Sequence, residues 1–177
     1  MNIYRNLDSI YKIAIGFLMI GFLCHAQTSL AKEVEEEEVD PFLPKVFKEE
    51  GITQLPEAPK MENLKQFTVN GGSSLKFFVD SKSLKIGNDG VIRYVVVIKS
   101  PSGAEQSKLE GLRCDTFEYK LYATLGDDGK WKPMNSSEWK MVPNQGYNQY
   151  QAALGRGGLC AGTSANSNFK ELLNNLP

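Results

Sequence analysis

The chain has 177 residues, of which 41% are hydrophobic, 23% charged and 10% aromatic, and its formal net charge is −1. These values exclude a disordered chain, a collagen-like fibre and a polytopic membrane protein, because none of them combines this apolar content with a negative mean hydropathy. At this length we expect one globular domain with an appendage.

Residues 1–31 have the pattern of a cleaved secretory signal. Arg5 and Lys12 give the segment a positive start, and residues 13–23 form an unbroken apolar run. This run is too short to cross a bilayer, which needs about 20 residues. Small residues predict cleavage after Ala31, with Ala26 as the alternative position. We therefore expect a periplasmic protein with no stable membrane insertion after cleavage.

Cleavage at either position changes the cysteine count. Cys24 and His25 lie in the removed segment, so the mature chain keeps two cysteines and no histidine. In an oxidising compartment these two, Cys114 and Cys160, are expected to form one disulfide, which would stabilise the fold by about 4 kcal/mol. A redox role is disfavoured because the two are far apart in the sequence, unlike a Cys-x-x-Cys pair.

The composition of the mature chain also disfavours several kinds of chemistry. Without histidine there is no imidazole base for a Ser or Cys nucleophile, and too few soft ligands remain for a zinc site. The mature chain has 18 basic and 20 acidic residues, counted after removal of Arg5, Lys12 and Asp8. Because there is no basic excess to neutralise phosphates, nucleic-acid binding is disfavoured. We predict no metal site and no cofactor.

Residues 32–63 are predicted to be an acidic and proline-containing extended segment. The like charges of residues 32–38 repel one another, which is typical of a solvated tether. The prolines that follow favour extended backbone. Phe42, Phe47 and Leu55 are the apolar side chains expected to anchor this segment on the domain.

The body of the chain, residues 64–177, reads as short strands separated by turns. The expected strands are 64–69, 75–80, 83–86, 91–98, 104–114 and 118–125. Residues 95–98 are apolar on both alternating faces, which is typical of a central strand covered on both sides. Residues 100–103 form a tight-turn sequence that should return the chain antiparallel, with Ser102 at its centre.

The C-terminal part changes period, which favours helices over residues 149–154 and 168–176. Strands followed by helices indicate an α+β fold. We predict an antiparallel β-meander sheet, backed by one or two C-terminal helices, in a single domain with one disulfide.

One group of charges is a candidate ligand site. If the turn is centred on Ser102, Arg93 lies opposite a position close to Glu110 and Arg113, so these charges could cluster on one side of the sheet. Such a cluster could recognise a carboxylate or phosphate through the arginine fork, with Tyr94 and Trp139 as walls. The alternative is a cross-strand ladder of ion pairs that fixes the register, and the sequence favours this alternative.

Two further hypotheses remain open. The aromatic residues suggest carbohydrate stacking, although core and rim aromatics are commoner in a small sheet protein; they are Tyr94, Tyr119, Tyr122, Trp131 and Trp139. A carboxylate-based hydrolase acting on envelope glycans would need two acids facing one cleft. Its candidates are Asp80, Asp89, Glu110, Asp115 and Glu118.

Four short segments, found in this order, resemble the CNP1-like family. They are residues 80–94 (DSKSLKIGNDGVIRY), 100–104 (SPSGA), 110–114 (EGLRC) and 120–123 (KLYA). The resemblance runs from about Phe47 to the C-terminal helix. It implies a secreted, single-domain protein of Gram-negative bacteria with a strand-rich body, and it brings no established activity.

These observations together predict an exported binding or envelope-accessory module. Its partner would be an unknown small ligand or an envelope protein. The alternatives are the glycan hydrolase above and a structural protein–protein interaction module, which would show an exposed apolar patch or an unpaired sheet edge.

Overall fold

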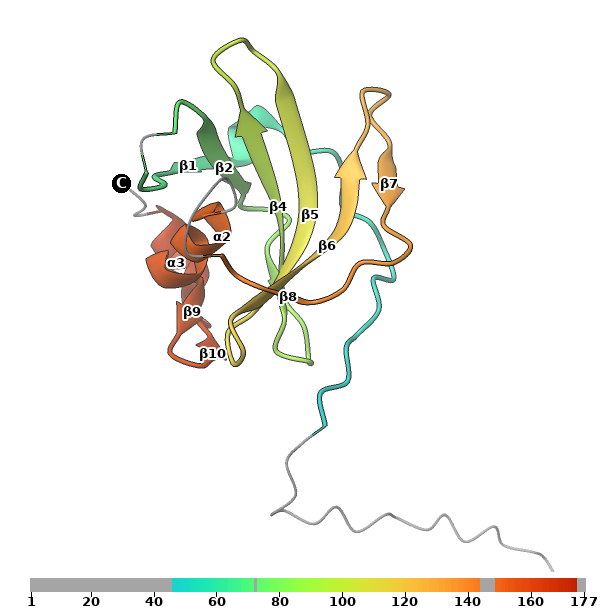
Figure 1. The fold of residues 1–177 in the computed structure, drawn as a ribbon, viewed down its shortest axis with the longest axis vertical. Helices are drawn as coiled ribbons and strands as arrows, with labels where there is room; N and C mark the ends of the chain where they lie inside the picture. The colour runs from blue at the N-terminus through green and yellow to red at the C-terminus, as the bar shows by residue number, and fades with distance from the viewer. Residues whose placement is uncertain (1–45, 72, 144–148, 175–177) are drawn as a thin grey trace, which may run out of the picture. The chain divides into compact units, whose positions relative to one another are not determined.

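The fold is built on one antiparallel sheet (Figure 1). The computed structural model describes residues 46–71, 73–143 and 149–174, all within one compact unit, Lys45–Pro177. Among these residues the sheet has eight strands, and its main path runs β1-β2-β4-β5-β6-β7. Strands β3 and β8 pair with β4 and β6 respectively. The strands are β1 Leu64–Phe67, β2 Lys76–Asp80, β3 Lys85–Ile86, β4 Ile92–Lys99, β5 Glu105–Arg113, β6 Glu118–Leu125, β7 Trp131–Pro133 and β8 Lys140–Met141.

The turn between β4 and β5 sets the register of the sheet centre. Gly103 adopts a φ of 89°, a conformation that glycine reaches without a steric cost, and its N–H donates to the Ser100 carbonyl at 3.0 Å. The ladder places Arg93 opposite Gly111. The predicted turn centre at Ser102 is therefore confirmed.

Strand β4 is the central strand and is covered on both faces, as its apolar run predicts. Val96 and Ile98 belong to the first and larger buried cluster, whereas Val95 and Val97 belong to the second. The two clusters lie on opposite faces because successive side chains of a strand alternate.

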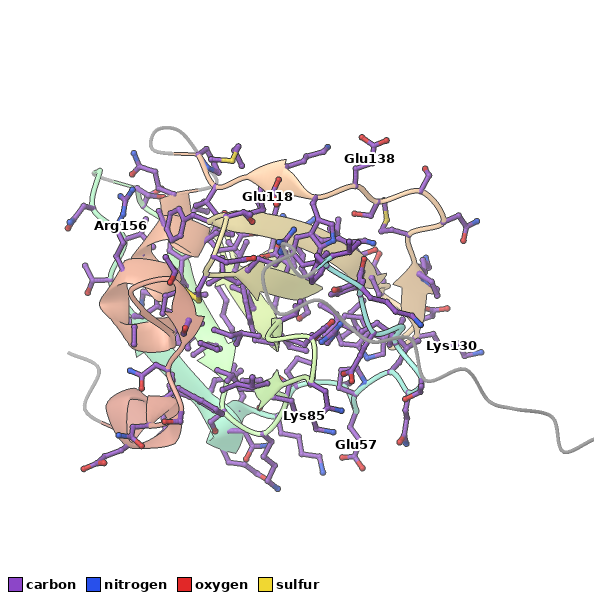
Figure 2. All side chains as sticks on the ribbon, turned by 90° about the horizontal axis from the view of Figure 1, so that it is seen from below. Glu57, Lys85, Glu118, Lys130, Glu138 and Arg156 are labelled. Carbon is purple, nitrogen blue, oxygen red and sulfur yellow. A yellow bond between two sulfur atoms is a disulfide. The ribbon has the colours of Figure 1, made fainter. Side chains whose placement is uncertain are left out.

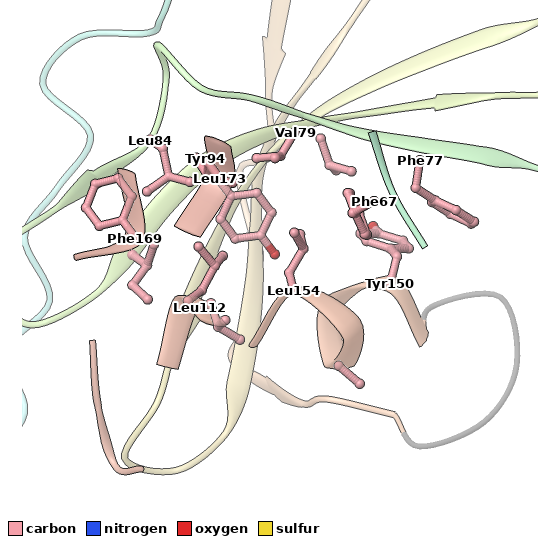
Figure 3. Packing of buried hydrophobic residues seen from close by; sticks show 14 of the residues in the cluster. Phe67, Phe77, Val79, Leu84, Tyr94, Leu112, Tyr150, Leu154, Phe169 and Leu173 are labelled. Carbon is pink, nitrogen blue, oxygen red and sulfur yellow. The ribbon is translucent and has the colours of Figure 1, made fainter. Parts of the chain in front are cut away.

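The C-terminal segment covers the first face. It consists of α2 Gln149–Leu154, a π-helical turn at Gly155–Leu159, the two-stranded pair β9 Cys160–Ala161 and β10 Ser164–Ala165, and α3 Phe169–Asn174. Tyr150, Leu154 and Phe169 pack into the larger cluster with Tyr94 (Figure 3). The predicted Cys114–Cys160 disulfide is confirmed and ties the end of β5 to this segment, with its Cα atoms 5.6 Å apart.

The second face is covered by the segment before β1. We call residues 46–60 the strap; a short 3₁₀ turn, Met61–Asn63, connects it to β1. Leu55 packs against the second cluster, and Trp131 Nε1 donates to the Pro56 carbonyl at 2.8 Å. Phe47 makes an edge contact with Trp139 at a centroid distance of 5.9 Å. Phe42, the third expected anchor, lies outside the described residues.

The α+β prediction is thus confirmed, as an antiparallel meander with short C-terminal helices. Strands β7 and β8 were not expected, and each has only two or three residues paired with β6. Such short strands depend on the partner strand and leave little periodic signal in the sequence. Within the described part of the chain, no helix is both long and apolar enough to span a bilayer.

Candidate functional site

The structure separates the predicted charge cluster between the two faces of the sheet. Arg93 pairs with Gly111, whereas Tyr94 pairs with Glu110. Neighbouring residues of a strand point to opposite faces, so Glu110 lies on the helix-covered face and Arg93 on the strap-covered face. The expectation that Arg93, Glu110 and Arg113 share one side is therefore wrong for Glu110. The predicted pairing of β4 with β5 was right. In that pairing the side chains alternate between the faces, so Glu110 and Arg93 point to opposite sides of the sheet.

Glu110 is a buried carboxyl whose hydrogen-bond donors are neutral side chains. It is 1% exposed, on β5 beneath α2. Its Oε1 accepts from the Tyr150 hydroxyl at 2.5 Å, and its Oε2 accepts from the Tyr94 hydroxyl at 3.2 Å. The Gln151 Nε2 lies 3.4 Å from both carboxyl oxygens. Three donors, one from the neighbouring strand β4 and two from α2, thus converge on one carboxyl.

Burial controls the ionisation of this group. It raises the pKa of Glu110 to about 7, although the hydrogen bonds from Tyr150, Tyr94 and Gln151 and the charge of Lys108 oppose the rise. Burial and the neighbouring carboxyl also raise the pKa values of both tyrosine hydroxyls, which therefore stay protonated as donors. Glu110 changes charge near neutral pH, a property common in binding and catalytic sites.

A pocket of about 290 Å³ lies against Glu110. Its lining comes from β5, β6, β8, α2 and the loop before β8, and consists of Lys108, Glu110, Tyr119, Leu121, Met134, Ser136, Ser137, Glu138, Lys140, Tyr150 and Gln151. The Gln151 side chain is 1% exposed, and among the described residues its Oε1 has no hydrogen-bond donor. An unpaired buried acceptor costs about 1–3 kcal/mol, so a donor from a ligand would relieve a real penalty.

Arg93 is fixed on the other face by the loop before β4 and by the strap. Its two terminal nitrogens donate to the Asp89 carboxylate at 3.0 and 2.7 Å, and Nη2 also donates to the Glu50 carbonyl at 2.7 Å. Burial alone would raise the pKa of Asp89, but hydrogen bonds from Arg93 and from the Glu50 and Val91 amides lower it to about 2. The carboxylate partner of Arg93 is therefore Asp89 and not the predicted Glu110.

Arg113 and Trp139 lie on the same face as Arg93. The Arg113 guanidinium binds Asp115 at 2.7 Å and Glu118, its cross-strand partner, at 3.2 Å. It also stacks 3.8 Å from the centroid of the Phe47 ring. Trp139 Nε1 donates to Glu49 of the strap at 3.1 Å. The Arg113–Glu118 pair is of the cross-strand kind that the ion-pair alternative expects, whereas the contacts with Phe47 and Glu49 join the strap to the sheet.

Sequence reasoning missed Tyr150 and Gln151, which complete the Glu110 site. The sequence predicts helix 149–154 but gives no signal for which side chains it presents to β5, about 40 positions earlier. Tyr94 was expected as a wall of an arginine pocket; it is instead fully buried and donates to Glu110. In the described residues, no three His, Cys, Asp or Glu side chains are grouped so as to hold a metal ion.

Both the Glu110 pocket and the disulfide lie in a region that a family model recognises. The model of the CNP1-like family matches residues 44–177, which is more than half of the chain. The chain belongs to the CNP1-like family. No curated protein and no solved structure matches the chain. For this CNP1-like chain, the function must therefore be argued from the geometry of the site.

Proposed function

We propose that this CNP1-like protein is a binding module whose Glu110 pocket holds a small, neutral, hydroxyl-rich ligand such as a monosaccharide. The observation that supports this most directly is the pair of buried acceptors at the pocket, the Glu110 carboxyl and the unpaired Gln151 Oε1. Small-molecule sites are typically concave, with a few convergent polar groups. Hydroxyl groups of a ligand would supply the donor that Gln151 Oε1 lacks and a further donor to the Glu110 carboxyl.

The charges around the pocket favour a neutral ligand. Lys108 and Lys140 line it and would repel a cation, while Glu110 and Glu138 would repel an anion. A hydroxyl-rich molecule can donate to the carboxylate and accept from a lysine or serine without a charge conflict. The Tyr119 ring in the lining offers an apolar surface of the kind that sugar rings contact.

A two-carboxylate hydrolase has less support. Asp89 is bound to Arg93, and both Asp115 and Glu118 are bound to Arg113. Asp80 lines a pocket formed with the strap, on the other side of the sheet from Glu110. Of the five acids considered for catalysis, only Asp115 and Glu118 lie together, and both are held by the Arg113 guanidinium. A pair that flanks one glycosidic bond needs a separation of about 5–10 Å and one member that can act as an acid, and the other three candidates lie apart from this pair.

We also propose that the protein is exported and acts in the periplasm. The disulfide supports this, because disulfides persist in oxidising compartments. Intact-mass analysis of native material should show a chain beginning at residue 32 or 27 and two thiols that resist alkylation without reductant. A chain that keeps residues 1–26, with Cys114 and Cys160 both open to alkylation, would contradict export.

Ligand binding can be tested by NMR on the ¹⁵N-labelled mature chain. Glucose, galactose and N-acetylglucosamine are titrated separately while the Gln151 side-chain amide and the backbone amides of residues 134–138 are followed. At about pH 8, where the Glu110 carboxyl is charged, at least one sugar should shift these signals, and Glu110→Gln should weaken that binding at least about tenfold, because a charged acceptor is lost. Glu62→Gln is the matched control, since it removes the same charge from an exposed position. Absence of shifts with all three sugars, or equal affinity in Glu110→Gln, would contradict the proposal.

A further inference from the structure

A second pocket lies between the strap and the sheet, on the face opposite to Glu110. Its volume is about 450 Å³. The strap contributes mainly apolar side chains, among them Ile52, Leu55 and Pro56, and the sheet side contributes Lys82, Lys85 and Arg93. Figure 2 shows the labelled Lys85 and Glu57 on the same side of the molecule. The strap is therefore one wall of a site as well as a cover for the sheet.

The lining has more positive than negative side chains. Four cations, Lys60, Lys82, Lys85 and Arg93, stand against two acids, Asp80 and Glu57. Lys60 and Glu57 pair with each other at 3.6 Å. Lys85 lies directly opposite Arg93 in the β3–β4 ladder, and like charges in this position are destabilising. Asp89 already offsets part of this repulsion, and an anion placed beside Lys85 would relieve the rest.

Arg93 adds a buried donor to this pocket. Asp89 and the Glu50 carbonyl occupy its terminal nitrogens and hold the guanidinium in one orientation. Among the described residues, the Nε of Arg93 is buried with no hydrogen-bond acceptor. An unsatisfied buried N–H is unfavourable, so a small movement that lets an anion in the pocket reach this donor would remove a penalty.

The remaining lining is largely apolar. Ile52, Leu55, Pro56 and Ala58 of the strap lie across from Leu109, which belongs to the buried cluster of this face. We propose that this pocket binds an organic anion, a carboxylate or phosphate that carries a short apolar body. The anionic group sits between Lys82, Lys85 and Arg93, and the apolar body lies along Leu55 and Leu109. This site is independent of the Glu110 pocket, which lies on the other face.

The test uses the mature chain and three probes that separate charge from apolar contact. Hexanoate carries both features, hexanamide has the same apolar body without charge, and inorganic phosphate has charge alone. The ¹⁵N NMR signal of the Arg93 Nε–H reports directly on the proposed donor. Hexanoate should shift this signal and the backbone amides of residues 55 and 82–85 at millimolar concentration, more strongly than hexanamide or phosphate. Equal shifts with hexanamide, or shifts confined to other residues, would overturn the proposal.

Charge-reversal variants provide the second measurement. Lys82→Glu/Lys85→Glu should weaken hexanoate binding at least about tenfold, because attraction by two cations becomes repulsion. Lys130→Glu/Lys132→Glu makes the same change of net charge at exposed positions that do not line the pocket and should bind hexanoate like the wild type. Both lysine pairs are exposed, so unfolding curves should verify that each variant is folded. Equal weakening in the two double variants would refute a local site. Glu110→Gln should leave hexanoate binding unchanged, which separates this proposal from the sugar-binding one.

Discussion

Replacement of Glu110 by glutamine should change how the stability of the protein depends on pH. Burial raises the pKa of Glu110 from 4.5 to about 7. Between these values the folded chain keeps the proton and the unfolded chain loses it, so the free energy of unfolding falls as the pH rises through this window. The pKa difference corresponds to a loss of about 3 kcal/mol that is complete above a pH of about 7.

Glutamine resembles the protonated carboxyl in shape and in hydrogen bonding, but it cannot ionise. We therefore expect Glu110→Gln to be about as stable as the wild type below pH 4.5 and more stable by about 2–3 kcal/mol near pH 8. The assay is urea unfolding of the oxidised protein at a series of pH values, with the midpoint and slope followed separately. Glu62→Gln controls for the loss of one negative charge. Parallel pH profiles for the wild type and Glu110→Gln would refute the assignment of a raised pKa to this carboxyl.

Three further variants test other parts of the structure by the same unfolding assay. Cys114→Ser/Cys160→Ser should lower the free energy of unfolding by about 4 kcal/mol, and a loss below about 1 kcal/mol would show that the bridge contributes little. Gly155→Ala should destabilise by about 1–3 kcal/mol, because its Cβ would lie 2.8 Å from the Phe117 ring; a more stable variant would mean that the ring moves aside freely. Asp89→Asn should cost about 2 kcal/mol near neutral pH, because its carboxylate has a pKa lowered to about 2. The stability that Asp89 contributes is present above pH 3.8 and is lost as the pH falls toward 2. If the wild type and Asp89→Asn lose stability equally between these pH values, the lowered pKa of Asp89 is refuted.

Much of the framework of this fold is encoded locally. The apolar run of β4 and the turn residues 100–103 predict a central strand and its antiparallel partner, and the observed pairing of Arg93 with Gly111 agrees with that register. The two cysteines that remain after residue 31 predict the bridge, which the structure has. These features depend on the pattern of apolar side chains along a strand, on the residue types of a turn and on the number of cysteines, and all three can be read from a linear sequence.

Only the tertiary structure decided what surrounds each charge. Two of the three donors to Glu110, Tyr150 and Gln151, come from α2, and the strap adds the Glu50 carbonyl to the partners of Arg93. Such long-range packing leaves no periodic trace in the sequence. The β5–β6 ladder also shifts register between Leu109 and Glu110, an irregularity that pattern alone does not reveal. The sequence by itself determined the long strands at the centre of the sheet, their register and the covalent link. The two pockets arise where segments distant in the chain pack on opposite faces of the sheet, because burial and pairing there depend on contacts that form only in the folded chain.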